Sequence, residues 1–297
     1  MQQELTIAIL GGLGTMLGWG FADFAAKRTV DGVGSIASLV WGHIFGTIVL
    51  FSVILFYLFG LNTPLDVPQG LTSWLWLIFF GTLQTIVYWL FYSGLEKGKA
   101  SLLAPIFSAY SGIVAVISLL VFSETIRSNG LLALATIFGG MLLLNIDVEA
   151  LRAKRLSLTT IPGFKHVFAA TLLAAIWLLG WDKFVKGMDW LSYTFFMYAF
   201  MTLSAVVIAK IQKADLRVFK KEVWYYLVLI GIGESLAYTA LSIGFSASSF
   251  TSVVAVIAGA SALPTIILAR IFLKERITKL QLFASLVIII GVIILAI

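Results

Sequence analysis

The sequence predicts an all-α membrane protein whose ten transmembrane helices form two inverted five-helix repeats. The first observation behind this prediction is composition: of the 297 residues, 61% are hydrophobic and 11% are charged. Soluble domains carry roughly 25% charged residues, so this chain is far less polar than they are. The apolar residues extend over the whole length and leave no room for a separate soluble domain. A lipid bilayer is therefore the solvent that suits the chain.

The second observation is the length and number of the apolar runs. About twenty helical residues cover the hydrocarbon core of a bilayer, and ten runs of that length occur. The runs are continuous rather than alternating, and they exceed the roughly 9–11 residues of a membrane strand, so we expect helices. The expected helices begin near Leu5, Ser35, Trp74, Ser101, Gly130, Lys165, Trp190, Trp224, Phe250 and Thr278.

The third observation is a set of matches between the two halves of the chain, in the same order in each. Gly81, Gln84, Tyr88 and Gly94 match Gly231, Glu234, Tyr238 and Gly244; Glu124 and Gly140 match Glu275 and Gly291; Asp23 and Lys27 match Asp182 and Lys186. We interpret residues 1–148 and 160–297 as two five-helix repeats. Because five is odd, the second repeat enters the membrane from the opposite side, which is an architecture typical of secondary transporters.

The basic residues predict the orientation of the helices. Of the 20 Lys and Arg residues, 17 lie in the odd-numbered connectors, and only Arg127, Lys183 and Lys186 lie in the even-numbered ones. Cytoplasmic loops are enriched in Lys and Arg. We therefore expect a multi-pass protein of the cell membrane with both termini outside the cytoplasm. The first residues lack the basic region and cleavage site of a signal peptide and predict a retained span.

Several stretches resemble the drug/metabolite transporter superfamily, EamA type. They are LGWGFADFAAK near the end of the first span, LLAPIFSAYSGIVAVISLLVFSETI, and LPTIILARIFLKERIT followed by IIIGVIILAI. The resemblance covers nearly the whole chain and implies ten helices, a central substrate cavity, and export or uptake of small metabolites. It also places Lys27 at the family's first-span lysine position. Many members have both termini inside, so the charge distribution here departs from them and is closer to that of the sugar-uptake porters.

Glu234 is the main candidate for a functional residue, because it lies near the middle of the eighth expected span, and its repeat mate Gln84 lies at the same depth of the third. Intramembrane carboxyl groups are costly and usually mark substrate or ion pathways. Glu234 could carry a proton or bind a substrate, and we expect it to line the cavity. The alternative is a protonated side chain that only ties two helices together by a hydrogen bond.

Other polar and aromatic residues extend this candidate site. His43 could bind a proton or a substrate, or could simply hydrogen-bond a neighbouring helix. The aromatic candidates Tyr88, Tyr238 and Trp19 could offer hydroxyl groups and ring faces to a ligand. The pairs Asp23–Lys27 and Asp182–Lys186 have the favourable helical spacing for ion pairs and are candidate gates at opposite membrane faces. The alternative is that these charges only reach from the span ends into water.

The sequence excludes several classes of function. There are no cysteines and only two histidines, so we expect no metal site, and no nucleotide or other cofactor motif is present. The basic residues are interpreted as topology signals, so we expect no nucleic-acid partner, and the partners expected are lipid and a small-molecule substrate.

The favoured function is a secondary active transporter that moves a small polar metabolite, such as an amino acid or a sugar, by alternating access, with Glu234 as a candidate proton carrier. A non-transporting membrane scaffold or sensor and an integral membrane enzyme are the alternatives, although no catalytic motif is found. Substrate identity, transport direction, coupling ion and oligomeric state stay open.

Overall fold

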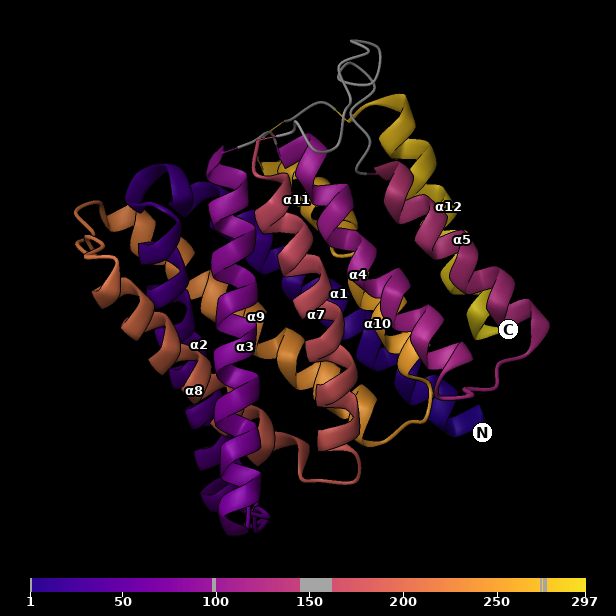
Figure 1. Ribbon diagram of the computed structural model, residues 1–297, viewed down its shortest axis with the longest axis horizontal. Coiled ribbons are helices and arrows are strands. Elements are labelled where there is room, and N and C mark those ends of the chain that lie inside the picture. Colours follow the sequence, from indigo (N-terminus) through magenta and orange to yellow (C-terminus); the bar gives the residue numbers. More distant parts are fainter. Residues whose placement is uncertain (1, 98–99, 145–161, 273, 275–276) are drawn as a thin grey trace.

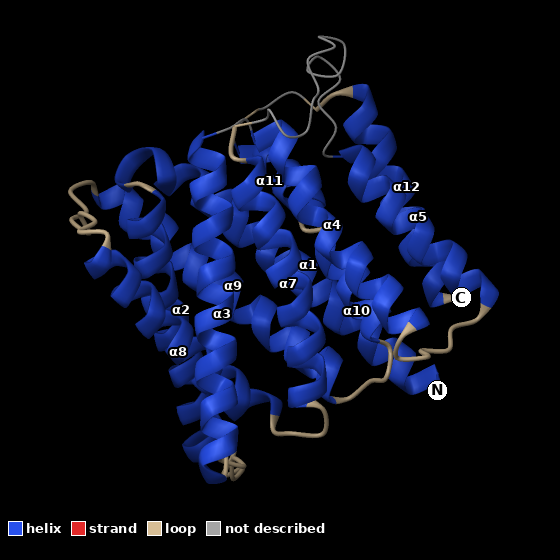
Figure 2. Cartoon of the chain, viewed as in Figure 1, coloured by secondary structure: helices blue, strands red, loops and turns tan. Residues whose placement is uncertain are grey.

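The computed structural model describes residues 2–97, 100–144, 162–272, 274 and 277–297, and these residues form a bundle of helices without strands (Figures 1 and 2). This part of the chain confirms the all-α prediction. The helices of the first half are α1 (Gln2–Val33), α2 (Ser35–Leu55), α3 (Gly70–Lys97), α4 (Ala100–Leu120) and α5 (Ser128–Leu144), with a π-helical turn η1 (Phe56–Gly60) that extends α2. Those of the second half are α7 (Phe164–Val185), α8 (Trp190–Ile211), α9 (Lys221–Ser246), α10 (Thr251–Gly259), α11 (Ala262–Phe272) and α12 (Lys279–Ala296).

Within the described residues, eight helical segments are long and apolar enough to cross a membrane, and two shorter apolar helices, Ile106–Leu120 and Ser128–Leu144, accompany them. The helices begin within a few residues of the predicted starts. One segment, Thr251–Phe272, consists of α10 and α11 with a break at Ala260 and Ser261, just before Pro264. A proline lacks the backbone N–H that would continue the helix, which accounts for a break here.

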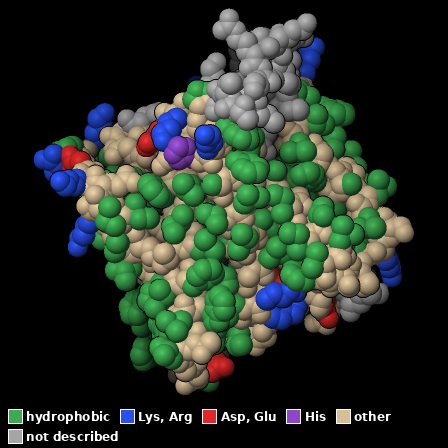
Figure 3. All heavy atoms as spheres, in the orientation of Figure 1, with side chains coloured by type: hydrophobic (Ala, Val, Ile, Leu, Met, Phe, Trp, Pro, Cys, Tyr) green, Lys and Arg blue, Asp and Glu red, His purple; other side chains and the backbone are tan. Residues whose placement is uncertain are grey.

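The surface of the bundle matches an apolar solvent. Hydrophobic side chains cover most of the visible face, whereas Lys, Arg, Asp and Glu gather toward its two ends (Figure 3). On α12, side chains such as Leu282, Leu286 and Ile290 are about half exposed. An exposed apolar surface of this extent is typical of helices that face lipid.

Helices of one half pack mainly on helices of the other half. α1 packs on α9, α3 on α7, α4 on α10, and α5 on α12. In the last pair the contacts are reciprocal: a Cβ on Gly140 would lie 2.9 Å from Ile288, and a Cβ on its repeat mate Gly291 would lie 2.7 Å from Ile137. The cores of the two halves are therefore shared.

The two halves also run in opposite directions. Glu4, near the start of α1, and Lys186, which directly follows α7, line the same pocket. The first helix of the second half thus ends where the first helix of the first half begins. The C-terminal end of α12 lies at this same end of the bundle, where Leu295 approaches Gly130 at the start of α5 (Figure 1).

Small residues bring α1 and α9 into direct backbone contact. A Cβ on Gly18 would lie 2.7 Å from the carbonyl oxygen of Gly233 and 2.7 Å from the backbone nitrogen of Ala237. Close approach of this kind is the usual role of glycine between membrane helices. It fixes the position of the residue that follows Gly233, which is Glu234.

Candidate functional site

Glu234 lies in the middle of α9 and is only 4% exposed. Two glycines position it: Gly233 contacts α1, and a Cβ on Gly231 would lie 2.5 Å from the backbone nitrogen of Gly46 on α2. α9 is therefore held between α1 and α2, and its carboxyl group points among buried side chains rather than toward lipid or water.

The carboxyl group of Glu234 accepts a short hydrogen bond from Tyr198 on α8. The Tyr198 hydroxyl lies 2.6 Å from Oε2 of Glu234. Gly46 makes this contact possible, since a Cβ at that position would overlap the Tyr198 hydroxyl. A distance of about 2.5–2.7 Å is typical of a hydroxyl that donates to a carboxylate oxygen.

His43 on α2 is the second neighbour of Glu234. Its Nδ1 lies 2.7 Å from the carbonyl oxygen of Leu39 and 3.5 Å from Oε2 of Glu234. A carbonyl oxygen can only accept, so Nδ1 carries a proton. The imidazole ring stacks on Tyr198 with centroids 5.3 Å apart. Nε2 is buried and has no hydrogen-bond partner in the described structure, so it is the ring atom that is free to exchange a proton or to bind a ligand.

Gln84 and Tyr88 on α3 reach the same cluster through Tyr238, which lies one turn after Glu234. Gln84 Nε2 donates to the Tyr238 hydroxyl at 2.9 Å, and this hydroxyl donates to that of Tyr88 at 3.3 Å. Trp19 on α1 meets the Tyr238 ring edge-on at 5.7 Å. Gln84 Oε1 and Trp19 Nε1 are buried without a partner among the described residues, and most buried polar atoms in proteins do have one.

The structure thus brings six of the seven candidate substrate or coupling residues into one cluster, namely Glu234, Gln84, His43, Tyr88, Tyr238 and Trp19. The side chain of the seventh, Lys27, lies outside the described part of the structure. The cluster holds a carboxyl group, an imidazole, three tyrosine hydroxyls including that of Tyr198, and an amide. It can bind a small polar ligand by hydrogen bonds and can exchange a proton.

Tyr198 was missed in the sequence, although a signal for it exists. Thr47 and Thr202 are 155 residues apart, and their hydroxyl groups lie 2.8 Å from one another. The same spacing relates His43 to Tyr198, which stack on each other. Tyr88 and Tyr238, which match at a spacing of 150, also touch. Matching residues of the two halves therefore meet at this cluster, and the pattern His-x-x-x-Thr against Tyr-x-x-x-Thr could have identified Tyr198.

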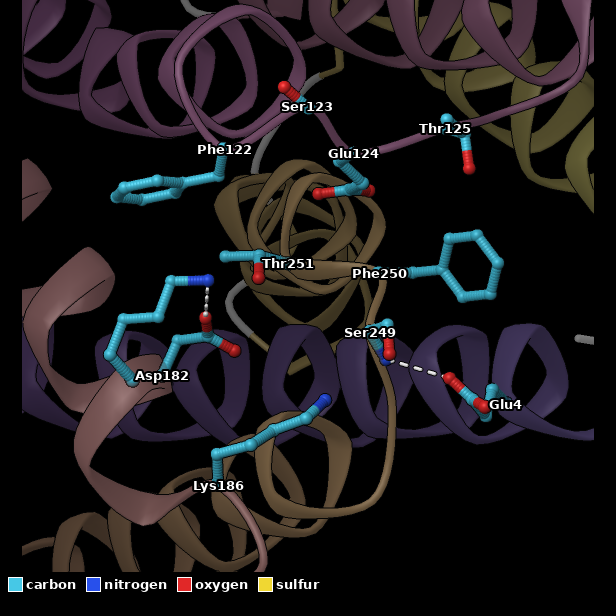
Figure 4. Close-up of a pocket in the computed structure, with 11 residues that line it drawn as sticks. Glu4, Phe122, Ser123, Glu124, Thr125, Asp182, Lys186, Ser249, Phe250 and Thr251 are labelled. Atoms are coloured by element: carbon cyan, nitrogen blue, oxygen red, sulfur yellow. Dashed lines mark hydrogen bonds and ion pairs between the residues drawn. The ribbon is translucent and has the colours of Figure 1, made fainter.

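A pocket of about 420 Å³ opens at the end of the bundle where α1 begins (Figure 4). It lies between the start of α1, the end of α7, the α4–α5 loop and the α9–α10 loop. We name it the outer pocket, and it is lined by Glu4, Phe122, Ser123, Glu124, Thr125, Asp182, Lys183, Lys186, Ser249, Phe250 and Thr251.

The expected ion pair between Asp182 and Lys186 is not the one that the structure shows. Asp182 pairs instead with Lys183, Oδ2 to Nζ 3.4 Å, and Lys186 donates to the carbonyl oxygen of Ser248. The physical reason is that α7 ends at Val185, so Lys186 has a non-helical backbone and its side chain leaves the face that carries Asp182. For the other expected pair, Asp23 has an exposed side chain on α1, while the side chain of Lys27 is not described, so the gating role of these residues stays a prediction.

Glu124 has a structural role in the outer pocket. Its carboxylate accepts hydrogen bonds from the backbone nitrogen of Ser252, at 3.0 Å, and from the Ser252 hydroxyl. It therefore caps the N-terminus of α10, where a negative charge is favourable. Burial raises the pKa of Glu124, and the two hydrogen bonds from Ser252 oppose that change. In the described residues, no three His, Asp or Glu side chains converge to hold a metal ion.

Comparison with known proteins gives the family of this chain. The profile of the EamA-like transporter family matches twice, over residues 6–146 and 162–297. The chain belongs to the EamA-like transporter family. Members of this family are membrane transporters rather than enzymes, so this multi-pass chain is a transporter-like membrane protein with two EamA repeats.

A solved structure shares the fold of this family member. It is described only as "Crystal structure of protein"; it is 15% identical in sequence, the alignment covers 97% of this chain and 96% of that chain, and the TM-score is 0.76. At this identity the likeness concerns the fold alone. A comparison with curated proteins finds no match.

Proposed function

We propose that this EamA-like protein is a secondary active transporter that moves a small polar metabolite by alternating access, through ten membrane crossings with both termini outside the cytoplasm. The observation that carries the proposal is the central cluster around Glu234. It contains three buried polar atoms that have no hydrogen-bond partner among the described residues: Trp19 Nε1, His43 Nε2 and Gln84 Oε1. A donor, an acceptor and a ring nitrogen left open around one carboxyl group suit a polar ligand.

The position of the cluster supports alternating access. Matching residues of two oppositely directed halves meet there, as the contacts of Tyr88 with Tyr238 and of Thr47 with Thr202 illustrate. In transporters with inverted repeats, the substrate and coupling-ion sites lie at the junction between the repeats, near the bilayer midplane.

Proton coupling at Glu234 is part of the proposal. Oε2 of Glu234 lies 3.5 Å from Nδ1 of His43, whose other ring nitrogen has no partner in the part of the chain that the structure describes, and it accepts a hydrogen bond from Tyr198. Two titratable groups in contact can exchange a proton when a ligand enters or leaves. A carboxyl group inside a membrane span is the usual kind of residue for this task.

The first experiment is a thermal-shift screen of purified protein against a metabolite panel at two pH values. A ligand that binds the folded state raises its apparent stability by mass action. We expect at least one hit that is lost in Glu234→Gln and kept in Glu222→Gln, a matched control at the exposed start of the same helix. Hits of equal size in both variants, with the same pH dependence, would return Glu234 to a purely structural role.

Counterflow in proteoliposomes then tests transport itself. Preloaded unlabelled metabolite should drive uptake of the labelled compound in wild type, and Glu234→Gln should reduce that exchange. Absence of exchange for every stabilising ligand would favour a scaffold or sensor. Because the chain has no cysteine, the orientation is tested by Thr63→Cys, which lies in the exposed α2–α3 loop and should react with an impermeant thiol reagent from outside intact cells.

A further inference from the structure

Asp182 is a buried carboxylate with one unused oxygen. Its side chain lies at the end of α7 and is 2% exposed as a residue, yet Oδ1 has no hydrogen-bond partner in the described part of the chain. Oδ2 lies 3.4 Å from Lys183 Nζ, and the Thr251 hydroxyl donates a hydrogen bond to the carboxyl group (Figure 4). Leaving a carboxyl oxygen buried and unpaired is unfavourable unless a cation or donor completes it.

The other two carboxylates of the outer pocket already have partners. Glu4 accepts from the backbone nitrogen of Ser249 at 3.1 Å, and Glu124 accepts from Ser252. Lys186 is held by the carbonyl oxygen of Ser248 on the α9–α10 loop. Asp182 Oδ1 is therefore the buried carboxyl oxygen of this pocket that has no hydrogen-bond partner among the described residues.

Lys183 shows what kind of group the pocket holds well. Its Nζ lies 4.3 Å from the centroid of the Phe122 ring and 3.4 Å from Asp182 Oδ2. An aromatic face together with a carboxylate is a recognised way to bind an ammonium group. The Lys183 side chain is 55% exposed, so it can move into water and leave this place to a ligand.

From these contacts we infer that the outer pocket is a second ligand site, which binds the ammonium group of a small organic cation against Asp182 and Phe122. The volume of about 420 Å³ falls within the roughly 300–1,000 Å³ of small-molecule sites. A metal ion fits less well, since no three acidic or histidine side chains converge among the described residues.

An aromatic wall connects the outer pocket to the central cluster. Trp181, next to Asp182, stacks on Trp177 with centroids 5.8 Å apart, and Trp177 meets Tyr238 edge-on at 5.8 Å. An ammonium compound in the outer pocket would therefore be separated from Glu234 by aromatic rings that are fully buried in this structure. That this compound is also the transported metabolite rests on the proposed function, whereas its binding in the outer pocket does not.

The test uses single cysteines, because the chain has none of its own. Thr125→Cys places an exposed thiol in the outer pocket, and Thr63→Cys places one in an exposed loop at the same end outside it. The protein, in lipid nanodiscs, is treated with two methanethiosulfonate reagents. One carries a cationic trimethylammonium group, and the other carries an anionic sulfonate group. We expect the ratio of cationic to anionic reaction rates to be at least about threefold higher for Thr125→Cys than for Thr63→Cys, as a local negative charge would give.

Two further arms decide the role of Asp182. Asp182→Asn should bring the ratio at Thr125→Cys down to that of the control cysteine, while Asp66→Asn, an exposed acid at the same end, should leave it unchanged. Ethylammonium should slow labelling of Thr125→Cys and ethanol should not, and this arm needs no change at Asp182. Equal ratios for the two cysteines, faster reaction of the anionic reagent, or equal protection by ethylammonium and ethanol would each overturn the inference. Protection that persists in Glu234→Gln separates this site from the central one, and counterflow separately tests transport.

Discussion

The hydrogen bond between Tyr198 and Glu234 allows a quantitative test of the central cluster. Tyr198→Phe removes one hydroxyl group but keeps the aromatic ring, which stacks on His43 at 5.3 Å and meets Tyr238 at 5.5 Å. The ring packing is therefore a constant, and the change reports mainly on the 2.6 Å contact with Glu234 Oε2.

The expected magnitude depends on the charge of the acceptor. Hydrogen bonds between neutral groups of membrane helices contribute about 0.6 kcal/mol on average. Hydrogen bonds to charged groups contribute about 1.5–3 kcal/mol. We therefore expect a coupling energy between Tyr198 and Glu234 of at least about 0.6 kcal/mol, and one of about 1.5–3 kcal/mol, roughly a ten- to hundredfold change in the equilibrium constant, would identify a charged acceptor.

The assay is a double-mutant cycle on the free energy of unfolding in mixed micelles, with Tyr198→Phe, Glu234→Leu and the double variant. The coupling energy is the departure of the double variant from the sum of the single ones. Tyr225→Phe, which removes a hydroxyl group from a 64% exposed ring, is the control and should change the free energy of unfolding by less than about 0.5 kcal/mol. A coupling energy below about 0.3–0.5 kcal/mol, the usual error of additivity, would refute the bond as a feature of the folded protein.

Three further predictions follow from local geometry. Gly46→Ala should lower the free energy of unfolding by about 1–3 kcal/mol, because the added methyl group overlaps Tyr198, which binds the carboxyl group of Glu234. Gly139→Ala, which has open space around it, should be tolerated in the same denaturation assay, and equal losses for the two variants would contradict this reasoning. Burial raises the pKa of Glu124 above 4.5, so the folded protein keeps this proton to higher pH than the unfolded chain does. The contribution of Glu124 to the free energy of unfolding should therefore fall as pH rises above 4.5, and Glu124→Gln should show a smaller fall than wild type in a pH series of unfolding curves. Hydrogen bonds from Arg217 hold the pKa of Asp215 at about 2, so the ion pair contributes its full stabilisation above pH 3.8 and loses it as pH falls toward 2. Arg217→Ala should return the pKa of Asp215 toward 3.8 in an NMR titration, and an unchanged pKa would contradict the contact.

The helices were predictable because long apolar runs leave the backbone no other way to satisfy its hydrogen bonds in lipid. The predicted starts therefore agree closely with the observed ones, from Ser35 and Trp190 to Phe250. The central cluster was partly predictable for a different reason. The match of Gln84 and Tyr88 with Glu234 and Tyr238 selects positions at equal depth in each half, and oppositely directed halves bring such positions together.

The contacts that escaped prediction depend on where helices end and on which residues oppose each other. The spacing of Asp182 and Lys186 favours an ion pair only if α7 continues past Val185, and it does not. Tyr198 carries no charge and stands among other aromatic residues, so its composition does not single it out, and only the match of its spacing with that of His43 in the other half could have identified it.

The shared packing of the two halves has a consequence for how the chain matures. α1 leaves the ribosome well before its backbone partner α9, which is made some two hundred residues later, and α5 must wait in the same way for α12. Until then the glycine faces of α1 and α5 have only lipid beside them. The first half thus lacks the packing partners of α1 and α5 when it stands alone, so its helices must insert into the membrane before they can assemble with the second half. Coexpression of separate fragments 1–148 and 160–297 should therefore yield protein only when both are present in the same membrane.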